Sequence, residues 1–527
     1  MSVASASPGA KFDCIVIGGG HNGLVCANYL ARSGRSVLVL EANSRLGGAA
    51  ATREFAPGFR VSAGAHLLHL MPRELISDLR LESHGLEWAG TQLASTALLE
   101  GRAPLDLAAG PADGSAGAAE DAAALAAYRA CMQRYAAALA PMFANVPPRL
   151  GTNAWADRLA LLRLGWQIRR LGRTDMRELL RIGAMNIYDL LEEHFRTPQL
   201  QGALAFDAIL GTNCGPRTPG TVLTLLYRLA AESAAGGIGL AQPRGGLGAV
   251  STALANAASA AGASVRTSAP VARILVASDR ACGVVLESGE QIGADTVISS
   301  ADPKTTLLGL LGARHLDTGF VRRVTHIRAR GLAAKLHLAL DGAPKFKGLN
   351  TRQLAGRLLV APSMQDIEHA FNHAKYGEFS AQPVMEITIP TIADASLAPA
   401  GSHVLSAIVQ YAPYALREGW DAARPRFLDV IMGSLERHAP GLKASVIASE
   451  LLTPLEMERE FRIAGGHWHH GELAFDQFLM VRPVPGAAQH ATPLAGLFLC
   501  GAGCHPGGGV MGIAGRNAAR QILKQVS

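Results

Sequence analysis

The chain is poor in charged and aromatic residues. Asp, Glu, Lys and Arg make up 17% of its 527 residues, Phe, Trp and Tyr only 5%, and hydrophobic residues 49%. This composition excludes an intrinsically disordered protein, and the length predicts two domains instead of one core. The net charge of +7 is small for this size and comes from no basic block, so we expect no nucleic-acid partner.

Cysteine is also scarce. The seven cysteines are an odd number, and no Cys-x-x-Cys pair occurs among them. We therefore expect free thiols in a reducing compartment, because a disulfide framework needs paired cysteines. Cys500 and Cys504 form the one close pair, and the Gly-Ala-Gly between them favours a close backbone approach to a ligand over a redox pair.

Segments typical of export or membrane insertion are missing as well. The first ten residues lack both charge and an apolar run, so we expect no signal peptide. The uncharged stretch from Cys14 to Leu30 is slightly short for a membrane span, and four glycines interrupt it. A strand, a turn and a helix explain it better.

An apolar run near the N-terminus is followed by closely spaced glycines, a helical pattern and a second apolar run. We expect a strand, a helix and a strand over 13–17, 24–33 and 36–40. A Gly-x-Gly-x-x-Gly motif stands between the first strand and the helix, and an acidic residue follows the second strand. Together these features are typical of dinucleotide binding.

Each residue of the motif has its own physical role. Gly18 permits the tight turn, Gly20 lets the backbone approach a pyrophosphate, and Gly23 lets the helix pack closely on the strand. The start of the helix offers N–H groups to the phosphates. Glu41, 18 residues after Gly23, can accept the hydroxyls of an unphosphorylated ribose, which favours FAD or NAD over NADP.

Two further glycine-rich segments can reach an anionic ligand. Arg45, Gly47 and Gly48 follow the second strand and can bring a cation and more N–H groups to a pyrophosphate. Near the C-terminus, a strand over 496–500 leads through a glycine-rich turn into a helix over 514–526. This second segment predicts a return of the chain to the same ligand.

From 72 to 235 the sequence predicts mostly helices, including an alanine-rich one over 116–140. Residues 157–181 contain seven arginines against three acidic residues, a net charge of 7 − 3 = +4. Apolar residues are interleaved with these charges, among them Leu159, Leu162 and Trp166. The pattern fits a basic amphipathic helix on an anionic membrane, or a core-facing stripe with a solvated basic face.

The rest of the chain contains one more glycine-rich helix start and then mostly predicted strands. Gly246 and Gly248 precede a helix over 249–261, but Ser251 replaces the third glycine of a nucleotide motif and no apolar strand comes before. We therefore expect no second dinucleotide domain for NAD(P)H.

A β-meander over 271–302 should return to the first sheet. A second sheet is expected to contain strands over 332–340, 384–392 and 403–410, covered by a helix over 426–437 that Pro425 starts.

The segment from Glu41 to Gly48 resembles the one after the second strand in the glutathione-reductase-like FAD superfamily, in its amine oxidase and phytoene desaturase branch. The whole chain resembles the phytoene dehydrogenase- or carotenoid oxidoreductase-like FAD flavoproteins. This resemblance implies an α/β fold, with a Rossmann-like FAD-binding domain and a mixed α+β substrate domain. The FAD-binding domain would comprise 1–75, 236–305 and 460–527, and the substrate domain 76–235 and 306–459.

The same resemblance implies FAD as the cofactor, with the Val271 backbone at the adenine and Gly501 and Gly512 near the pyrophosphate and flavin ring. Flavin N5 would take a hydride from a small apolar, polyene- or lipid-like substrate, and oxygen or a quinone would then accept the electrons. No catalytic residue is assigned. Candidate acid–base groups are His66, His69, His470 and His505.

Several alternatives stay open. A flavin amine oxidase would need an aromatic pair in its site, and a non-catalytic FAD-binding interaction protein would need no substrate. The run His467 to His470 resembles a metal cluster, but adjacent histidines in one strand point to opposite faces, so we expect no metal. We expect a cytoplasmic protein, or a mitochondrial-matrix one in a eukaryote, with peripheral membrane contact and the oligomeric state left open.

Overall fold

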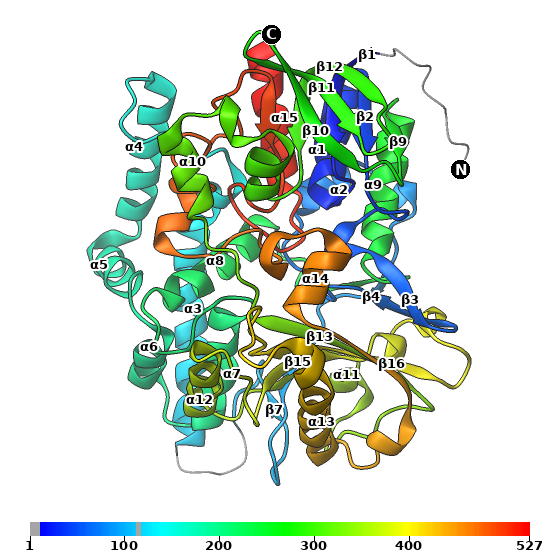
Figure 1. Ribbon diagram of the computed structural model, residues 1–527. Helices are drawn as coiled ribbons and strands as arrows, with labels where there is room; N and C mark the ends of the chain where they lie inside the picture. The colour runs from blue at the N-terminus through cyan, green and yellow to red at the C-terminus, as the bar shows by residue number, and fades with distance from the viewer. Residues whose placement is uncertain (1–10, 112–116, 527) are drawn as a thin grey trace.

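The computed structural model describes residues 11–111 and 117–526, and Figure 1 shows two lobes that are each built on their own sheet. The upper lobe in this view holds the elements from both ends of the chain, and the lower lobe holds most of its middle. Ala116, the expected start of the alanine-rich helix, lies outside the described residues.

The upper lobe contains a seven-stranded sheet in the order β10-β11-β12-β1-β2-β9, with β18 beside β12. The strands are β1 (Lys11–Ile17), β2 (Val37–Leu40), β9 (Ser264–Arg266), β10 (Val271–Ala277), β11 (Arg280–Leu286), β12 (Gln291–Ser299) and β18 (Leu497–Leu499). β1, β2, β9, β12 and β18 are parallel, whereas β10 and β11 join β12 as an antiparallel meander. The meander and the return of the C-terminal strand are thus confirmed.

Helices cover both faces of this sheet. The first face packs on α1 (His21–Arg32), α9 (Gly248–Ala260) and α15 (Ile513–Val526). The second face packs on α10 (Thr318–Thr325). Val16 and Val39 point to the first face and Ile15 and Leu38 to the second, because the central parts of β1 and β2 are covered on both sides and are therefore apolar on both faces. The expected strand-turn-helix-strand unit and the Rossmann-like fold are confirmed.

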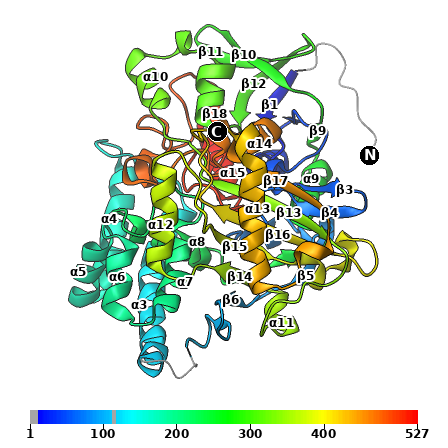
Figure 2. The same ribbon diagram turned by 60° about the horizontal axis from the view of Figure 1, so that its bottom comes forward.

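The lower lobe contains a second seven-stranded sheet in the order β17-β13-β16-β15-β14-β6-β7. The strands are β6 (Ser95–Ala97), β7 (Leu105–Asp106), β13 (Ala333–Leu340), β14 (Arg357–Val360), β15 (Val384–Thr388), β16 (His403–Gln410) and β17 (Val446–Leu452). Figure 2, in which this lobe comes forward, shows α13 (Trp420–His438) lying across the sheet. All of its strand pairs are antiparallel except β14 with β6.

Two boundaries expected for this lobe are wrong. The helix does not start at Pro425 but at Trp420, because Trp420 and Ala423 are buried against the sheet and this packing carries the helix through the proline. The strand expected over 384–392 ends at Thr388. Pro390 lacks the N–H that would continue the ladder, and a 3-10 turn follows.

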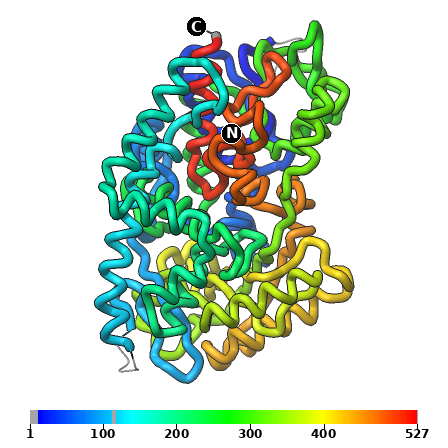
Figure 3. The backbone as a smooth tube through the Cα atoms, turned by 90° about the vertical axis from the view of Figure 1, so that its left-hand side faces the viewer, coloured from blue at the N-terminus to red at the C-terminus, as the bar shows by residue number. Residues whose placement is uncertain are grey.

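The helical part forms an outer wall, which Figure 3 shows in cyan and teal on the side that faces the viewer. Its helices are α3 (Ala118–Ala144), α4 (Trp155–Arg170), α5 (Gly172–Ile182), α6 (Ile187–His194), α7 (Pro198–Ile209) and α8 (Thr221–Ala234). The basic segment 157–181 is therefore two helices and not one, because Gly172 takes a left-handed conformation (φ +87°).

The stretch 72–235 is also less uniformly helical than expected. After α2 (Arg73–Asp78) it contains β6 and β7, which extend the second sheet, and β5 (Trp88–Gly90), which pairs with β8 (Gln242–Pro243). Such short strands carry too little periodicity to be found in sequence. The remaining elements are a hairpin of β3 (Thr52–Ala56) and β4 (Phe59–Ser62), and helices α11 (Thr351–Leu354), α12 (Met364–Lys375) and α14 (Pro454–Phe461).

Within residues 11–111 and 117–526, none of the helices combines the length and the apolar character that a bilayer crossing requires.

Candidate functional site

A cavity of about 320 Å³ runs from the carboxyl ends of β1 and β2 to the second sheet. Residues of the first lobe, such as Leu40 and Val271, line one end, and Glu386 and Ile408 of the second sheet line the other. Seven glycines from separate parts of the chain line it between these ends: Gly18, Gly20, Gly47, Gly48, Gly64, Gly508 and Gly509. A wall of this kind exposes backbone N–H groups without side chains in the way.

Glu41 lies at the first end of the cavity. Its Oε2 atom accepts the N–H of Gly19 at 2.7 Å and its Oε1 atom accepts the N–H of Asn43 at 2.9 Å. A carboxylate has about four acceptor positions, so two remain for the hydroxyls of a ribose. Val271, the residue expected at the adenine, lines the same end.

The turn before α1 forms the middle of the cavity. A Cβ atom on Gly20 would meet nothing closer than Ser300 Oγ at 3.9 Å, so this wall is open to a ligand. Nε2 of His21 and Oδ1 of Asn22, both in residues that line the cavity, are buried without a hydrogen-bond partner. Unpaired polar atoms and free N–H groups at a helix start fit the pyrophosphate of a dinucleotide.

Gly23 lies behind this wall and not in it. A Cβ atom there would come within 2.1 Å of the Gly18 carbonyl oxygen, so only glycine lets α1 pack this closely on the turn. Gly501 has a similar position behind the cavity, since its Cβ atom would lie 2.3 Å from the carbonyl oxygen of Ser300.

Two other residues expected at the cofactor do not line the cavity. Arg45 is exposed and is not among the residues that line the cavity. Gly512 starts the turn into α15 with φ +74°, and a Cβ atom there would press on Leu75 and Val25 at 3.0 Å. In the C-terminal turn, the residues that line the cavity are Ala502, Gly508, Gly509 and Val510. The residues of this turn that line the cavity thus differ from the glycines at which the sequence predicted the contact.

His505 is not in the cavity. Its Nε2 atom lies 2.7 Å from the carbonyl oxygen of Met142, and its ring stacks on Phe143 with 6.3 Å between centroids. Burial lowers the pKa of this imidazole to about 3, so it is neutral at physiological pH. We conclude that His505 holds α3 against the C-terminal turn.

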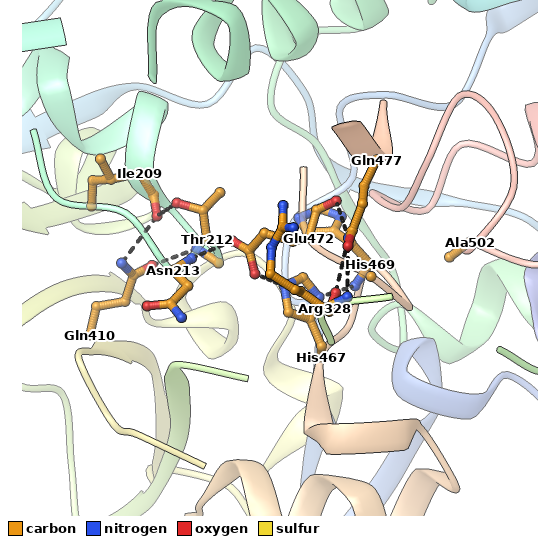
Figure 4. Close-up of polar contacts among 12 residues, drawn as sticks. Ile209, Thr212, Asn213, Arg328, Gln410, His467, His469, Glu472, Gln477 and Ala502 are labelled. Carbon is orange, nitrogen blue, oxygen red and sulfur yellow. Dashed lines mark hydrogen bonds and ion pairs between the residues drawn. The ribbon is translucent and has the colours of Figure 1, made fainter. Parts of the chain in front are cut away.

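The run His467 to His470 is a series of turns, not a strand, and the expectation of alternating faces is wrong. His469 and His470 both line the cavity, while Nε2 of His467 lies 3.2 Å from Oε2 of Glu472. Figure 4 shows this carboxylate also accepting the N–H of Asn213, which follows α7. Among the described residues no group of histidines, cysteines and carboxylates has the arrangement of a metal site.

Arg482 fixes this series of turns although it is only 1% exposed. Its Nη1 atom donates to the carbonyl oxygens of Glu472 and Gln477, and its Nη2 atom to those of His469, Gly471 and Ala502. Figure 4 shows His469 and Gln477 together on one side of Glu472, with Ala502 beyond them. One buried guanidinium therefore joins the segment carrying His469 and His470 to the C-terminal turn.

The second end of the cavity is a buried charged network. Nζ of Lys335 lies 2.7 Å from Nδ1 of His66, and Nε2 of His66 lies 2.9 Å from Oε1 of Glu386. Arg357 donates to the other oxygen of Glu386 and to Oδ1 of Asp207, the latter at 2.5 Å. Of these five residues, His66, Asp207 and Glu386 line the cavity.

Strand register explains why these groups meet. Ile408 of β16 pairs with Lys335 of β13 on one side and with Glu386 of β15 on the other. Side chains in one row across neighbouring strands point to the same face of a sheet, so these three residues face the cavity side together. The sequence missed Lys335, Glu386, Arg357 and Asp207. For the first three the signal was a charge within an otherwise apolar strand, and for Asp207 it was the one charge in the apolar helix α7.

Burial sets the protonation of this network. Desolvation lowers the pKa of Lys335 to about 7, and desolvation together with the Lys335 charge lowers the pKa of His66 to about 4. Burial alone would raise the pKa of Glu386, but Arg357 and His66 outweigh it and hold that pKa well below its usual value. At neutral pH His66 is therefore neutral and Glu386 is ionised.

The chain is similar to known proteins along most of its length. Residues 23–363 match the family described as flavin containing amine oxidoreductase. The mouse (Mus musculus) pyridine nucleotide-disulfide oxidoreductase domain-containing protein 2 is 35% identical over 98% of this chain and 94% of its own. One of the subunits of limonene dehydrogenase from Castellaniella defragrans is 26% identical over 98% of this chain and 95% of its own. A phytoene desaturase from Pantoea ananas is 26% identical over 63% and 64%.

The fold is also similar to that of a solved amine oxidase. Cyclohexylamine oxidase from Brevibacterium oxydans superimposes with a TM-score of 0.60 at 19% identity, over 98% of this chain and 100% of the other. The family, the glycine-lined cavity and its unpaired polar atoms agree on the cofactor. This chain belongs to the flavin containing amine oxidoreductase family, and it is an FAD-dependent oxidoreductase with phytoene desaturases among its relatives.

Proposed function

We propose that this enzyme transfers a hydride from an apolar, polyene- or lipid-like substrate to its flavin, while His69 receives the proton that leaves with it. Bound FAD supplies the hydride-accepting N5 atom. Removing a hydride and a proton from neighbouring carbons creates a double bond, so the protein has to supply an apolar binding site and one proton acceptor.

The observation that carries this proposal is the pairing of the carboxylates in the cavity. Asp207 and Glu386 are both bound to Arg357, and Arg228 lies 3.2 Å from Asp207. An ammonium substrate would have to compete with these guanidinium groups, whereas a neutral hydrocarbon would not. Apolar side chains complete this part of the wall: Leu67, Leu70, Leu210, Leu240, Ile408 and Leu473.

His69 is better suited than His66 or His470 to accept the proton. Both ring nitrogens of His66 have partners, and His470 lies near the turn before α1, where it helps to lower the pKa of His21. Nδ1 of His69 is buried without a partner in the cavity wall, and burial lowers its pKa, so the ring is neutral.

A route for the proton out of the cavity supports this role. Nε2 of His69 lies 3.9 Å from Oε1 of Glu232, whose side chain is 35% exposed. Burial raises the pKa of Glu232, which makes this carboxylate a better proton acceptor than an ordinary one. His69 can therefore take a proton on Nδ1 and release one from Nε2 toward Glu232.

The experiment is anaerobic reduction of the purified holoenzyme, followed by flavin absorbance. Limonene, a carotenoid polyene and putrescine are mixed separately with the enzyme. We expect a hydrocarbon to bleach the flavin and the amine to leave it oxidised. Bleaching by putrescine alone would contradict the apolar substrate and favour an amine oxidase. A flavin that none of them reduces, and that dithionite does reduce, would favour a non-catalytic FAD-binding protein.

We also propose oxygen or a quinone as the electron acceptor, in a reducing compartment such as the cytoplasm or the mitochondrial matrix. The turn at the start of α9 is engaged within the protein, since Leu247 and Gly248 donate their N–H groups to Ser62 and Thr52 hydroxyls. This supports an enzyme without a second nucleotide site, whose flavin passes its electrons to oxygen or a quinone.

The free state of all seven cysteines supports a reducing compartment.

A further inference from the structure

Helices α4 and α5 form an outer surface with a concentration of exposed apolar side chains. Among the described residues, nine large hydrophobic side chains are exposed, and six of them lie between residues 150 and 180. They are Leu150, Trp155, Leu159, Leu162, Trp166 and Leu180. Figure 1 places α4 and α5 at the outer edge of the molecule.

Four of these residues form a single line on α4, here called the α4 stripe: Trp155, Leu159, Leu162 and Trp166. Their spacing of four, three and four residues puts them on one face of the helix. The two tryptophans are 74% and 64% exposed. The stripe thus points into solvent, and the expectation of a core-facing stripe in this segment is wrong for Leu159, Leu162 and Trp166.

The opposite face of α4 is apolar as well. Leu161, Leu164 and Ile168 are half-buried against the body, and Asp157 is the one residue of this helix that is buried. A surface helix normally has an apolar face toward the core and a polar face toward water. A helix that is apolar on two faces typically packs one face on its own protein and buries the other in a second apolar surface, such as a partner protein or a membrane.

Arginines flank the α4 stripe on both sides. At about 100° per residue, Arg158 and Arg169 fall on one side of it, and Arg163 and Arg170 on the other. All four are exposed. In the described part of the chain, Arg163, Arg169 and Arg170 have no ion-pair partner.

The acidic residues of this segment do not neutralise these arginines. Asp157 lies 3.2 Å from Arg149, and Asp175 of α5 lies 2.8 Å from Arg134. The excess of positive charge therefore stays next to the exposed tryptophans.

We propose that the α4 stripe docks on an anionic lipid bilayer, with α4 parallel to the membrane plane. Tryptophan prefers the membrane–water interface, and arginines on both sides of an apolar stripe can reach lipid phosphates while the stripe enters the headgroup layer. A second copy of this chain fits less well, because a symmetric contact between two stripes would place arginines against arginines. This inference does not depend on the substrate proposed above.

The test is co-sedimentation of the full-length holoenzyme with phosphatidylglycerol or phosphatidylcholine vesicles at low and high salt. We expect pelleting with phosphatidylglycerol at low salt, release at high salt, and weak pelleting with phosphatidylcholine. The double variants Leu162→Ser/Trp166→Ser and Arg163→Glu/Arg170→Glu should each bind at least about tenfold more weakly. Circular dichroism and flavin content check that both variants fold.

The controls carry changes of the same kind elsewhere on the surface. Tyr376→Ser removes a side chain that is 75% exposed, and Arg322→Glu/Arg352→Glu makes the same change of charge at exposed sites. Both should bind like the wild type. No pelleting of the wild type, or equal loss in stripe and control variants, would overturn the proposal. The proposal would also be overturned if the wild type did not bind the vesicles and was a dimer in the ultracentrifuge, and if Leu162→Ser/Trp166→Ser was a monomer.

Discussion

Nζ of Lys335 lies 2.7 Å from Nδ1 of His66, although 269 residues separate the two along the chain. An ammonium group can only donate hydrogen bonds, so Nδ1 accepts and His66 carries its proton on Nε2, where Glu386 accepts it. This arrangement fixes the tautomer and the orientation of the His66 ring in the cavity wall. It also places a buried amine of lowered pKa beside the candidate substrate site.

The buried Lys335 predicts a rise of stability with pH. Its pKa is about 7 in the folded chain and 10.5 ordinarily, so between these values the unfolded chain binds more protons than the folded one. The free energy of unfolding should therefore increase from pH 7 to about 8.5, by at most about 1.4 kcal/mol per pH unit. Urea denaturation at several pH values measures it.

The variant Lys335→Met should lack this increase, because methionine does not titrate. Lys345→Met, at an exposed site, should keep the slope of the wild type. Parallel slopes for wild type and Lys335→Met would mean that Lys335 does not titrate in this range.

The proton-acceptor role predicts a kinetic effect of His69→Gln. With the substrate that reduces the flavin, the rate constant of reduction should fall by about 10²–10⁴-fold, while the flavin content is kept. Stopped-flow absorbance measures both. Glu232→Gln should slow the reaction less, and His373→Gln, at a half-exposed site paired with Glu378, should not slow it. Unchanged reduction by His69→Gln would exclude this residue as the acceptor.

The position of Glu41 predicts an effect on cofactor affinity. Glu41→Gln removes the charge that accepts the N–H groups of Gly19 and Asn43 and that we expect to accept the ribose hydroxyls, so FAD binding should weaken by about 1–3 kcal/mol. Calorimetric titration of the apoprotein with FAD gives the dissociation constant. Glu87→Gln, at a side chain that is 70% exposed, serves as the control and should bind FAD like the wild type.

NADPH and NADH should reduce the flavin slowly or not at all. The reason is that the glycine-rich turn before α9 is engaged within the protein, since the N–H groups of Leu247 and Gly248 are bound to the hydroxyls of Ser62 and Thr52. Stopped-flow mixing under anaerobic conditions tests this directly, with dithionite to demonstrate that the flavin can be reduced. Bleaching within milliseconds would require a nicotinamide site elsewhere on the protein.

Arg482 should contribute far more to stability than an exposed arginine does. Arg482→Met would remove one donor from each of five buried carbonyl oxygens, of which only that of Glu472 keeps another among the described residues, the Nε2 atom of Gln477, and should lower the free energy of unfolding by at least about 3 kcal/mol. Arg328→Met breaks an exposed pair with Asp476 and should cost about 0–1 kcal/mol. Chemical denaturation of both variants measures the difference, and similar losses would contradict the stabilising role of Arg482.

The sequence by itself determined the cofactor-binding unit. Gly18, Gly20 and Glu41 lie close together in the sequence, within one strand-turn-helix-strand unit. Such a unit is built from neighbouring residues and depends little on contacts with the rest of the chain. Apolar strands buried on both faces were equally visible, because burial demands continuous hydrophobicity.

Only the tertiary structure decided the second end of the cavity. Lys335 and Glu386 come from strands whose pairing with β16 sets their common face, and no local pattern contains that register. Packing likewise put His505 behind the cavity and His69 in its wall, and turned Leu159, Leu162 and Trp166 to solvent. Sequence spacing determines only which side chains are neighbours within one helix or strand. The neighbours that a side chain has in other elements depend on how those elements pack together.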